Sequence, residues 1–255
     1  DWNDRFYMVG NEGAGGKVNV RYMGQPLNLK YAVASTDLGH NGYMEEENYG
    51  YNNRQKVIDY GFRATHLTAK IAQEIVNNYY NKPADYSYYV AGSAGARQGM
   101  MEVQRFPNDF DGYLLAAPVY NISAIHMWAI WKAKALSGEG AIHPDKIEHL
   151  ANAIYARCDD IDGVSDGVIE NPLACDFDPA VHLKNCTDGA DCFTDGQISA
   201  LNKIYDGVRN SAGDLIFPGQ PFGAEAKGDQ PSYMRTNGPQ SAWINSIVFG
   251  EDQVD

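Results

Sequence analysis

One segment, residues 86–118, constrains the fold more than any other part of the chain. A β-rich run at 86–91 is followed by a turn of small residues, a helical stretch at 94–106 and a second apolar run at 111–118. A strand, a tight turn, a helix and another strand form a βαβ unit, which closes with a right-handed crossover onto a parallel sheet. The sequence therefore predicts an α/β domain built on a parallel sheet.

Other segments of the first half extend this sheet. β-rich runs at 6–10 and 31–36 predict two more strands, and the first of them ends in the Gly-rich loop 11–16. Between residues 62 and 80, apolar or aromatic side chains recur at close to helical spacing, which predicts a helix. The members of this apolar stripe are Phe62, Leu67, Ile71, Ile75 and Tyr79.

Beyond about residue 125 the sequence changes character. Helical sequence rich in Trp and Ala gives way to a cluster of Cys and Asp residues and then to a tail rich in Gly and Pro. No strand alternation there would extend the sheet. We therefore predict the N-terminal part of an α/β core over residues 1–125 and a largely helical lid domain over residues 126–255. The C-terminal part of the core would then be absent from this chain.

The charge and hydropathy of the chain argue against two classes of partner. The formal net charge is −13, and no cluster of basic residues offers the local excess of Lys and Arg that a nucleic-acid binder needs. No apolar stretch approaches the roughly 20 residues that cross a bilayer. We expect neither nucleic acid nor a membrane as a partner.

The four cysteines all lie in the second half, between residues 158 and 192. They lack the CxxC spacing and the nearby histidines of a zinc site, and an even, clustered set is typical of disulfides. The sequence predicts two local bonds, Cys158–Cys175 and Cys186–Cys192. Because disulfides persist in oxidising compartments, we expect the protein to be secreted into the extracellular or periplasmic space.

Ser93 lies at the turn between the predicted strand at 86–91 and the predicted helix. A nucleophilic serine on such a sharp turn needs small neighbours, and Ala91, Gly92 and Gly95 provide them. The usual pattern is Gly-x-Ser-x-Gly, so Ala91 is a mild departure. Any tight βα turn also uses small residues, and the pattern alone leaves a catalytic turn and a purely structural one about equally open.

Backbone N–H groups near Ser93 offer a site for a negatively charged oxygen. The helix that begins at Ala94 directs its positive dipole end at this point, and Gly13 in the Gly-rich loop is the best candidate for a second donor. The loop 11–16 lacks the Lys-Ser or Lys-Thr ending of a phosphate loop and does not match GxGxxG. Nucleotide binding is therefore a poor interpretation of this loop, and a simple turn is the alternative.

The run of residues 159–169, between Cys158 and Cys175, carries closely spaced carboxylates. Such groups repel one another unless a cation neutralises them, and Gly163 and Gly167 allow the chain to curl so that oxygens converge. The pattern favours calcium, although the spacing is not that of an EF-hand. A solvated acidic turn is the alternative. A disulfide around the loop would suit a structural ion.

Taken together, these segments resemble the tannase and feruloyl esterase family of α/β-hydrolases. The similarity extends over nearly the whole chain, in ordered blocks at 1–6 with 9–13, 35–40, 93–98, 104–107, 109–112, 116–118, 158–169 and 209–213 with 218–219. The resemblance implies an α/β-hydrolase core with a largely helical, calcium-binding lid.

The resemblance also implies roles for particular residues. Ser93 would be the nucleophile of a serine carboxylic ester hydrolase that forms an acyl-enzyme with feruloyl, galloyl or hydroxybenzoyl-type esters. The amides of Ala94 and Gly13 would form the oxyanion hole. His40 and His66 are not the family's general base, and we interpret them as packing or hydrogen-bonding residues. A structural Ca²⁺ would be bound by Asp159, Asp162 and Asp166 and by the carbonyls of Val164 and Val168.

Two departures from the family pattern bear on catalysis. Gly92 stands where the family usually has a Cys that is tied to the strand of the catalytic His. The triad Asp and His would follow the lid, so we expect them beyond Asp255, on a truncated end or on a second polypeptide. Without a base, a serine hydroxyl is a weak nucleophile.

Alternative functions therefore stay open. One is a non-catalytic, calcium-dependent binding protein on a hydrolase scaffold. Another is a different serine hydrolase, such as a peptidase, which would leave the Asp-rich run unexplained. In the esterase interpretation, aromatic residues of the lid either select the acyl group of a small aromatic ester or form the lid's own core. The candidates are Trp128, Trp131, Tyr233 and Trp243.

Overall fold

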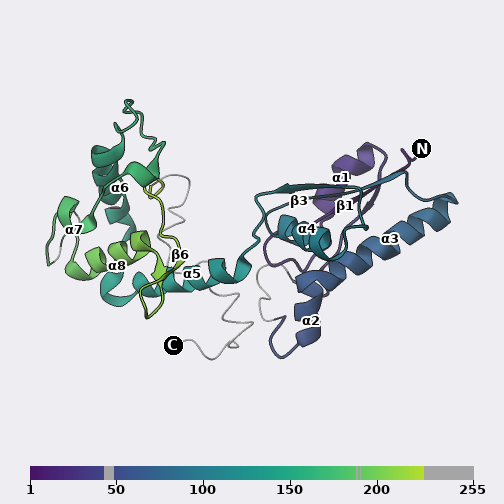
Figure 1. Cartoon of the computed structure of the whole chain (residues 1–255), viewed down its shortest axis with the longest axis horizontal. Helices are drawn as coiled ribbons and strands as arrows, with labels where there is room; N and C mark the ends of the chain where they lie inside the picture. Colours follow the sequence, from purple (N-terminus) through teal and green to yellow (C-terminus); the bar gives the residue numbers. More distant parts are fainter. Residues whose placement is uncertain (43–48, 188, 190, 227–255) are drawn as a thin grey trace. The chain divides into compact units, whose positions relative to one another are not determined.

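The computed structural model describes residues 1–42, 49–187, 189 and 191–226. Two of the aromatic candidates, Tyr233 and Trp243, fall outside these ranges. The chain divides into two compact units, one formed by residues 1–122 and the other beginning at Ser123. Figure 1 shows a sheet with helices in the first unit and a mainly helical second unit.

A four-stranded parallel sheet forms the centre of the first unit. Its strand order is β2-β1-β3-β4, and every neighbouring pair is parallel. Each strand overlaps a run that the sequence predicts, so the α/β class with a parallel sheet is confirmed. The strands are β1 (Arg5–Val9), β2 (Ala32–Ala34), β3 (Tyr86–Gly92) and β4 (Gly112–Ala116).

Helices lie on both faces of this sheet. β2 lies on one side of β1 and β3 on the other. The connection from β1 to β2 through α1 therefore runs across the sheet in the opposite direction to the connection from β2 to β3 through α3 and the connection from β3 to β4 through α4. Right-handed crossovers therefore place α1 on one face and α3 and α4 on the other, as Figure 1 shows. The helices are α1 (Val20–Asn28), α2 (Arg54–Ile58), α3 (Ala64–Tyr80) and α4 (Ser93–Arg105), with a π-helical turn at Asp59–Arg63.

The core of this unit lies between the sheet and α3 with α4. The sheet and the turn before β4 contribute the large side chains of this core, whereas α3 contributes the smaller Ala69 and Val76. The buried members are Phe6, Met8, Ala69, Val76, Tyr89 and Phe110. The predicted helix is present, but its apolar stripe is not the face that packs on the sheet. Leu67, Ile71, Ile75 and Tyr79 are 44–77% exposed.

The opposite face of the sheet is only partly covered in the described part of the chain. A cavity of about 340 Å³ on that face is lined mainly by aromatic and aliphatic side chains of β1, β3 and β4. Tyr86 and Leu114 are 51% and 66% exposed there. Among the described residues, β4 pairs with β3 alone, so its other edge is open.

The second unit is mainly helical. Its core forms where α6 and α8 pack, with Leu150, Ile154, Leu201 and Ile204 at most 1% exposed. β5 and β6 pair antiparallel with each other in a separate sheet, so they do not extend the parallel sheet. The elements are α5 (Ile122–Ala135), α6 (Pro144–Cys158), α7 (Pro179–His182), α8 (Asp195–Asp206), 3-10 turns at Gly138–Gly140 and Pro172–Ala174, β5 (Val208–Arg209) and β6 (Leu215–Phe217).

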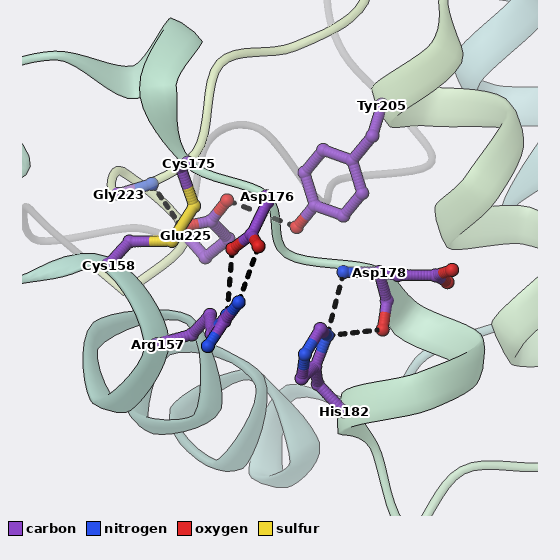
Figure 2. The surroundings of a disulfide bond; sticks show 9 residues. All are labelled: Arg157, Cys158, Cys175, Asp176, Asp178, His182, Tyr205, Gly223 and Glu225. Atoms are coloured by element: carbon purple, nitrogen blue, oxygen red, sulfur yellow. Dashed lines mark hydrogen bonds and ion pairs between the residues drawn. A yellow bond between two sulfur atoms is a disulfide. The ribbon is translucent and has the colours of Figure 1, made fainter.

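Both predicted disulfides are confirmed. Cys158 bonds Cys175, and Cys186 bonds Cys192, with Cα atoms 5.4 and 5.8 Å apart. The first bond joins the end of α6 to the segment before α7, beside the ion pair between Arg157 and Asp176 (Figure 2). None of the described helices is both long enough and apolar enough to span a membrane.

Candidate active site

Ser93 occupies the turn that the sequence predicts. It is the first residue of α4 and directly follows Gly92, the last residue of β3. Its φ of +50° lies in the left-handed region, which costs a non-glycine residue on the order of 1–3 kcal/mol. The side chain is exposed, whereas residues 94–99 of the same helix are buried. The turn therefore presents the hydroxyl at the carboxyl end of the parallel strands, where α/β folds place their ligands.

Close backbone contacts explain the small residues around Ser93. A Cβ added at Gly95 would lie 2.6 Å from the Asn11 carbonyl oxygen and 2.8 Å from the Ala91 Cβ. A Cβ added at Gly10 would lie 2.4 Å from the Tyr89 hydroxyl oxygen and 2.8 Å from the Gly95 Cα. The first turn of α4 thus packs directly on the chain that leaves β1, and the glycines permit this approach.

Gly92 has no such requirement. A Cβ added there would meet only the Ala116 carbonyl oxygen within 4 Å, at 3.8 Å. Its φ of −112° is ordinary extended backbone. Among the described residues, a methyl group therefore fits at position 92.

Asn11 anchors the start of the Gly-rich loop. Its side-chain amide donates hydrogen bonds to the carbonyls of Lys17 and Thr36, at 2.7 and 2.8 Å. Its backbone N–H donates to Oε1 of Gln98 in α4 at 3.4 Å, and that oxygen also accepts the Tyr89 hydroxyl at 3.0 Å. The loop that carries Gly13 is therefore attached to α4 and to the segment after β2. Donation by the Gly13 N–H to an oxyanion stays a prediction.

The N-terminal end of α4 suits a negative charge. Within the described ranges no side chain caps this end, and no acidic residue lies in the first turn. The first N–H groups of a helix have no partner within it, and here the positive end of the helix dipole is left unneutralised. The amide of Ala94 is among these groups, which supports its predicted role without testing it.

The described residues hold a His–Asp pair, but it lies far from Ser93. His66 Nδ1 is 2.5 Å from an Asp109 carboxylate oxygen, and the His66 ring stacks on Phe106. Glu102, which contacts Asp109, is nine residues beyond Ser93 in α4, about 14 Å along a helix that rises 1.5 Å per residue. The pair therefore cannot take the proton of Ser93.

His40 is also a packing residue. It is 5% exposed and stacks on Tyr49 with ring centroids 3.8 Å apart. Burial lowers the pKa of its imidazole, because desolvation disfavours the charged form. The expectation that His40 and His66 serve packing or hydrogen bonding is thus confirmed.

The Asp-rich run forms a curled, exposed loop after α6. Asp162 and Asp166 each use one carboxylate oxygen to accept the N–H of the residue two positions on, at 2.9 and 3.0 Å. Both oxygens of Asp159 accept the Gly167 N–H, at 2.9 and 3.1 Å. Gly163 and Gly167 have φ values of +92° and +76°, so the curl uses the left-handed backbone that glycine permits.

This loop has the donor set of a calcium site, although its geometry is open. With the partners that the structure describes, Asp162 and Asp166 each retain one carboxylate oxygen without a hydrogen bond, and Ca²⁺ binds hard oxygen ligands. Within the described part of the chain, the three carboxylates do not gather within 4.8 Å of one another. The residues fit the ion chemically, and binding would draw the loop together.

Two aromatic candidates of the second unit are partly buried within it. Trp128 lies 6.1 Å from Phe217 between ring centroids, with the Lys132 ammonium 4.7 Å over its own ring. The indole N–H of Trp131 is buried without a hydrogen-bond partner among the described residues. Trp128 therefore packs against side chains of α5 and β6 in its own unit, and substrate contact by either residue stays a prediction.

Buried carboxylates are the groups that no sequence pattern marks. Glu102, inside the predicted helix at 94–106, is 0% exposed, and Asp109 is 6% exposed. In the second unit Glu225 is also 0% exposed and accepts hydrogen bonds from the Tyr205 hydroxyl and the Gly223 N–H, at 3.0 and 2.9 Å (Figure 2). Asp and Glu side chains normally face water, so only the tertiary structure reveals these groups.

Comparison with known proteins agrees with this geometry. The sequence model described as tannase and feruloyl esterase matches residues 1–252. Feruloyl esterase B from Aspergillus niger is 29% identical over 264 residues, an alignment that covers 98% of this chain and 49% of that protein. The chain thus spans about half the length of the curated relatives that it matches.

Solved structures give the same picture. The crystal structure of feruloyl esterase B from Aspergillus oryzae matches with a TM-score of 0.83 and 27% identity, covering 100% of this chain and 52% of that one. Tannin acyl hydrolase from Aspergillus niger matches with a TM-score of 0.66 and 21% identity, over 88% of this chain and 44% of that one. The second likeness concerns the fold alone.

Proposed function

The chain belongs to the tannase and feruloyl esterase family, and we propose that it is the nucleophile-bearing part of a carboxylic ester hydrolase acting on small esters of aromatic acids. Its relatives are named feruloyl esterase B, which supports a feruloyl-type acyl group. Galloyl and hydroxybenzoyl esters are the close alternatives within the same class.

The observation that carries this proposal is the backbone of Ser93. A left-handed, exposed serine between β3 and α4 has the geometry of a nucleophile elbow. In the proposed reaction its hydroxyl oxygen attacks the ester carbonyl, and the alcohol leaves to give an acyl-enzyme, which water then hydrolyses. The amides of Ala94 and Gly13 would stabilise the oxyanion of each tetrahedral intermediate.

The proton of Ser93 needs a base, which His40 and His66 of the first unit do not supply because they serve packing and hydrogen bonding. We propose that a His, oriented by an Asp, is provided by a further segment of the core, on the same or a second polypeptide. The open edge of β4 and the partly covered face with exposed Tyr86 and Leu114 support this. Unpaired strand edges and exposed apolar patches are normally covered by another part of a protein.

We also propose that the Asp-rich loop holds a structural Ca²⁺. Its ligands would be the carboxylates of Asp159, Asp162 and Asp166 and the carbonyls of Val164 and Val168. The ion would neutralise the repulsion among these carboxylates. The Cys158–Cys175 disulfide closes the chain around the loop, which reduces the freedom that binding must remove. Together, the two disulfides support a secreted protein.

The test uses a form of the protein that includes the rest of the core. A fluorophosphonate probe should label Ser93, and Ser93→Ala should abolish both labelling and the turnover of methyl ferulate. Ser165→Ala, which changes an exposed serine of the Asp-rich run, is the matched control and should retain both. Calcium-dependent binding of ferulate esters without labelling would instead favour a binding protein, and turnover by Ser93→Ala would refute the assignment.

A further inference from the structure

A second cluster of chemically active side chains lies at the other end of α4 from Ser93. It consists of Glu102 of α4, Asp109 of the turn before β4 and His66 of α3, and one ligand-type atom from each lies within 4.8 Å of the others. Glu102 is 0% and Asp109 6% exposed. The proposed ester hydrolysis uses none of these groups.

The two carboxyl groups meet without a cation between them. Within the described residues, neither oxygen of Glu102 receives a hydrogen bond from an N–H group or a hydroxyl, and its polar contact is the Asp109 carboxyl. Two ionised carboxylates in contact at a buried position repel each other strongly, so one of the two must hold a proton. That proton then forms the hydrogen bond between them.

The surroundings show which carboxyl holds it. Asp109 faces His66 Nδ1 at 2.5 Å and the Lys70 ammonium at 3.7 Å, and both favour an ionised carboxylate. Among the residues that the structure describes, Glu102 has no cationic partner. Burial, together with the neighbouring Asp109, raises the pKa of Glu102 to about 8. Glu102 is therefore the neutral acid, and Asp109 is the acceptor from both Glu102 and His66.

A metal ion does not fit this geometry. Two ligands bound to one tetrahedral zinc at about 2.0–2.1 Å lie about 3.3 Å apart, whereas the His66 nitrogen and the Asp109 oxygen are 2.5 Å apart. That separation is a hydrogen bond. The ammonium of Lys70 beside Asp109 would also repel a cation.

We propose that Glu102, Asp109 and His66 form a buried proton-sharing cluster that joins α4 to α3 and to the turn before β4, and that loss of the Glu102 proton at alkaline pH loosens these contacts. The other titratable groups that face it are Lys70 of α3, Tyr89 of β3 and Tyr113 of β4. Burial, together with the neighbouring Glu102, raises the pKa of both phenols. A phenol carries no positive charge in either of its forms, so neither tyrosine compensates an ionised Glu102.

The predicted pH dependence has a definite sign. The pKa of Glu102 is about 8 in the folded chain, whereas the ordinary pKa of a glutamate carboxyl is 4.5, so the folded state binds one proton more than the unfolded state between these two pH values. Its contribution to stability is complete below about pH 4.5 and is lost as the pH rises to about 8. Over this pH window, ionisation of Glu102 should increase the unfolding equilibrium constant by up to about tenfold per pH unit.

Glu102→Gln tests the cluster because an amide keeps the shape and can donate to Asp109 at every pH. The free energy of unfolding of the full chain is measured in urea as a function of pH, and hydrogen exchange of α4 peptides is measured separately. Both should show that stability falls more steeply with rising pH in the wild type than in Glu102→Gln. The variant should equal or fall below the wild type at pH 5 and exceed it at pH 8.5. Glu74→Gln, at an exposed position of α3, is the matched control and should follow the wild type.

Direct titration of Glu102 keeps the test independent of how well the variant folds. Carbon-13 NMR of the glutamate side-chain carboxyls should show one carbon that titrates near pH 8 and disappears in Glu102→Gln. A Glu102 carboxyl that titrates near pH 4.5, or equal pH slopes for the wild type and Glu102→Gln, would overturn the proposal. So would stoichiometric binding of Zn²⁺ that stabilises the wild type and is lost in Glu102→Gln.

Discussion

Gly95 and Gly92 flank Ser93, yet alanine at the two positions should have opposite effects. At Gly95 the new methyl carbon would lie 2.6 Å from the Asn11 carbonyl oxygen and 2.8 Å from the Ala91 Cβ, well inside the roughly 3.5 Å of a comfortable contact. At Gly92 the nearest atom is 3.8 Å away and φ is ordinary. The first methyl forces the loop after β1 off the helix, and the second fits.

The magnitudes decide the sign. Overpacking costs about 1–3 kcal/mol, and the upper end applies at Gly95 because one of the contacting atoms is a backbone oxygen, which moves less freely than the end of a side chain. Alanine in a helix returns about 1 kcal/mol relative to glycine, so Gly95→Ala should lose about 2 kcal/mol. Gly92→Ala should gain about 0.4–1 kcal/mol from the less flexible unfolded chain. The two variants should therefore differ by about 2–3 kcal/mol.

Urea unfolding of the two variants and the wild type, monitored by far-ultraviolet circular dichroism, measures this difference. Hydrogen exchange of the peptide that contains Asn11 localises it, since Gly95→Ala should speed exchange there and Gly92→Ala should not. Equal stability of the two variants, or a larger loss at Gly92, would refute the inference that the first turn of α4 packs directly on the loop.

Three further predictions concern the loop and the second unit. Asn11→Ala should destabilise the first unit by about 1–3 kcal/mol, because the buried carbonyl of Thr36 and the partly buried carbonyl of Lys17 lose this donor; thermal unfolding measures it, and an unchanged midpoint would contradict it. Chelation of calcium should lower the midpoint of the second unit, and Asp162→Asn should weaken calcium binding in calorimetry; a chelator without effect would argue for a solvated turn. Replacing Cys158 and Cys175 by alanine should lower the free energy of unfolding by about 3 kcal/mol, and replacing Cys186 and Cys192 should lower it by about 2 kcal/mol. The first disulfide closes the longer loop, with a sequence separation of 17 against 6, and so restricts the unfolded chain more; equal losses in urea unfolding would refute this explanation.

Local pattern was sufficient to predict much of the fold. The strands of the parallel sheet are short β-rich runs, α3 carries apolar side chains at close to helical spacing, and α4 follows the tight turn after β3, so the sequence alone reveals them. The turn at Ser93 follows in the same way, because a strand that passes directly into a helix needs small neighbours. Disulfide partners were also predictable, since each pair is close in sequence.

Periodicity did not show which face of α3 packs on the sheet. The stripe through Leu67, Ile71, Ile75 and Tyr79 predicts the helix correctly, yet these residues are exposed in the described structure. The buried positions are small, because Phe6, Tyr89 and Phe110 already fill the space on the sheet side. The shape of the partner surface therefore selects the buried face, and one segment's sequence does not contain that shape.

Contacts between distant segments were likewise decided only by the tertiary structure. Asn11 meets Gln98 across 87 positions, and His66 meets Asp109 across 43. No spacing rule connects such residues, because the fold of the chain between them sets their distance. The sequence by itself determined the parallel sheet, the turn at Ser93 and the local disulfides, all products of short-range geometry. The tertiary structure decided why Gly95 must be glycine and which two carboxyl groups share a proton, since close packing and repulsion arise only once the chain is folded.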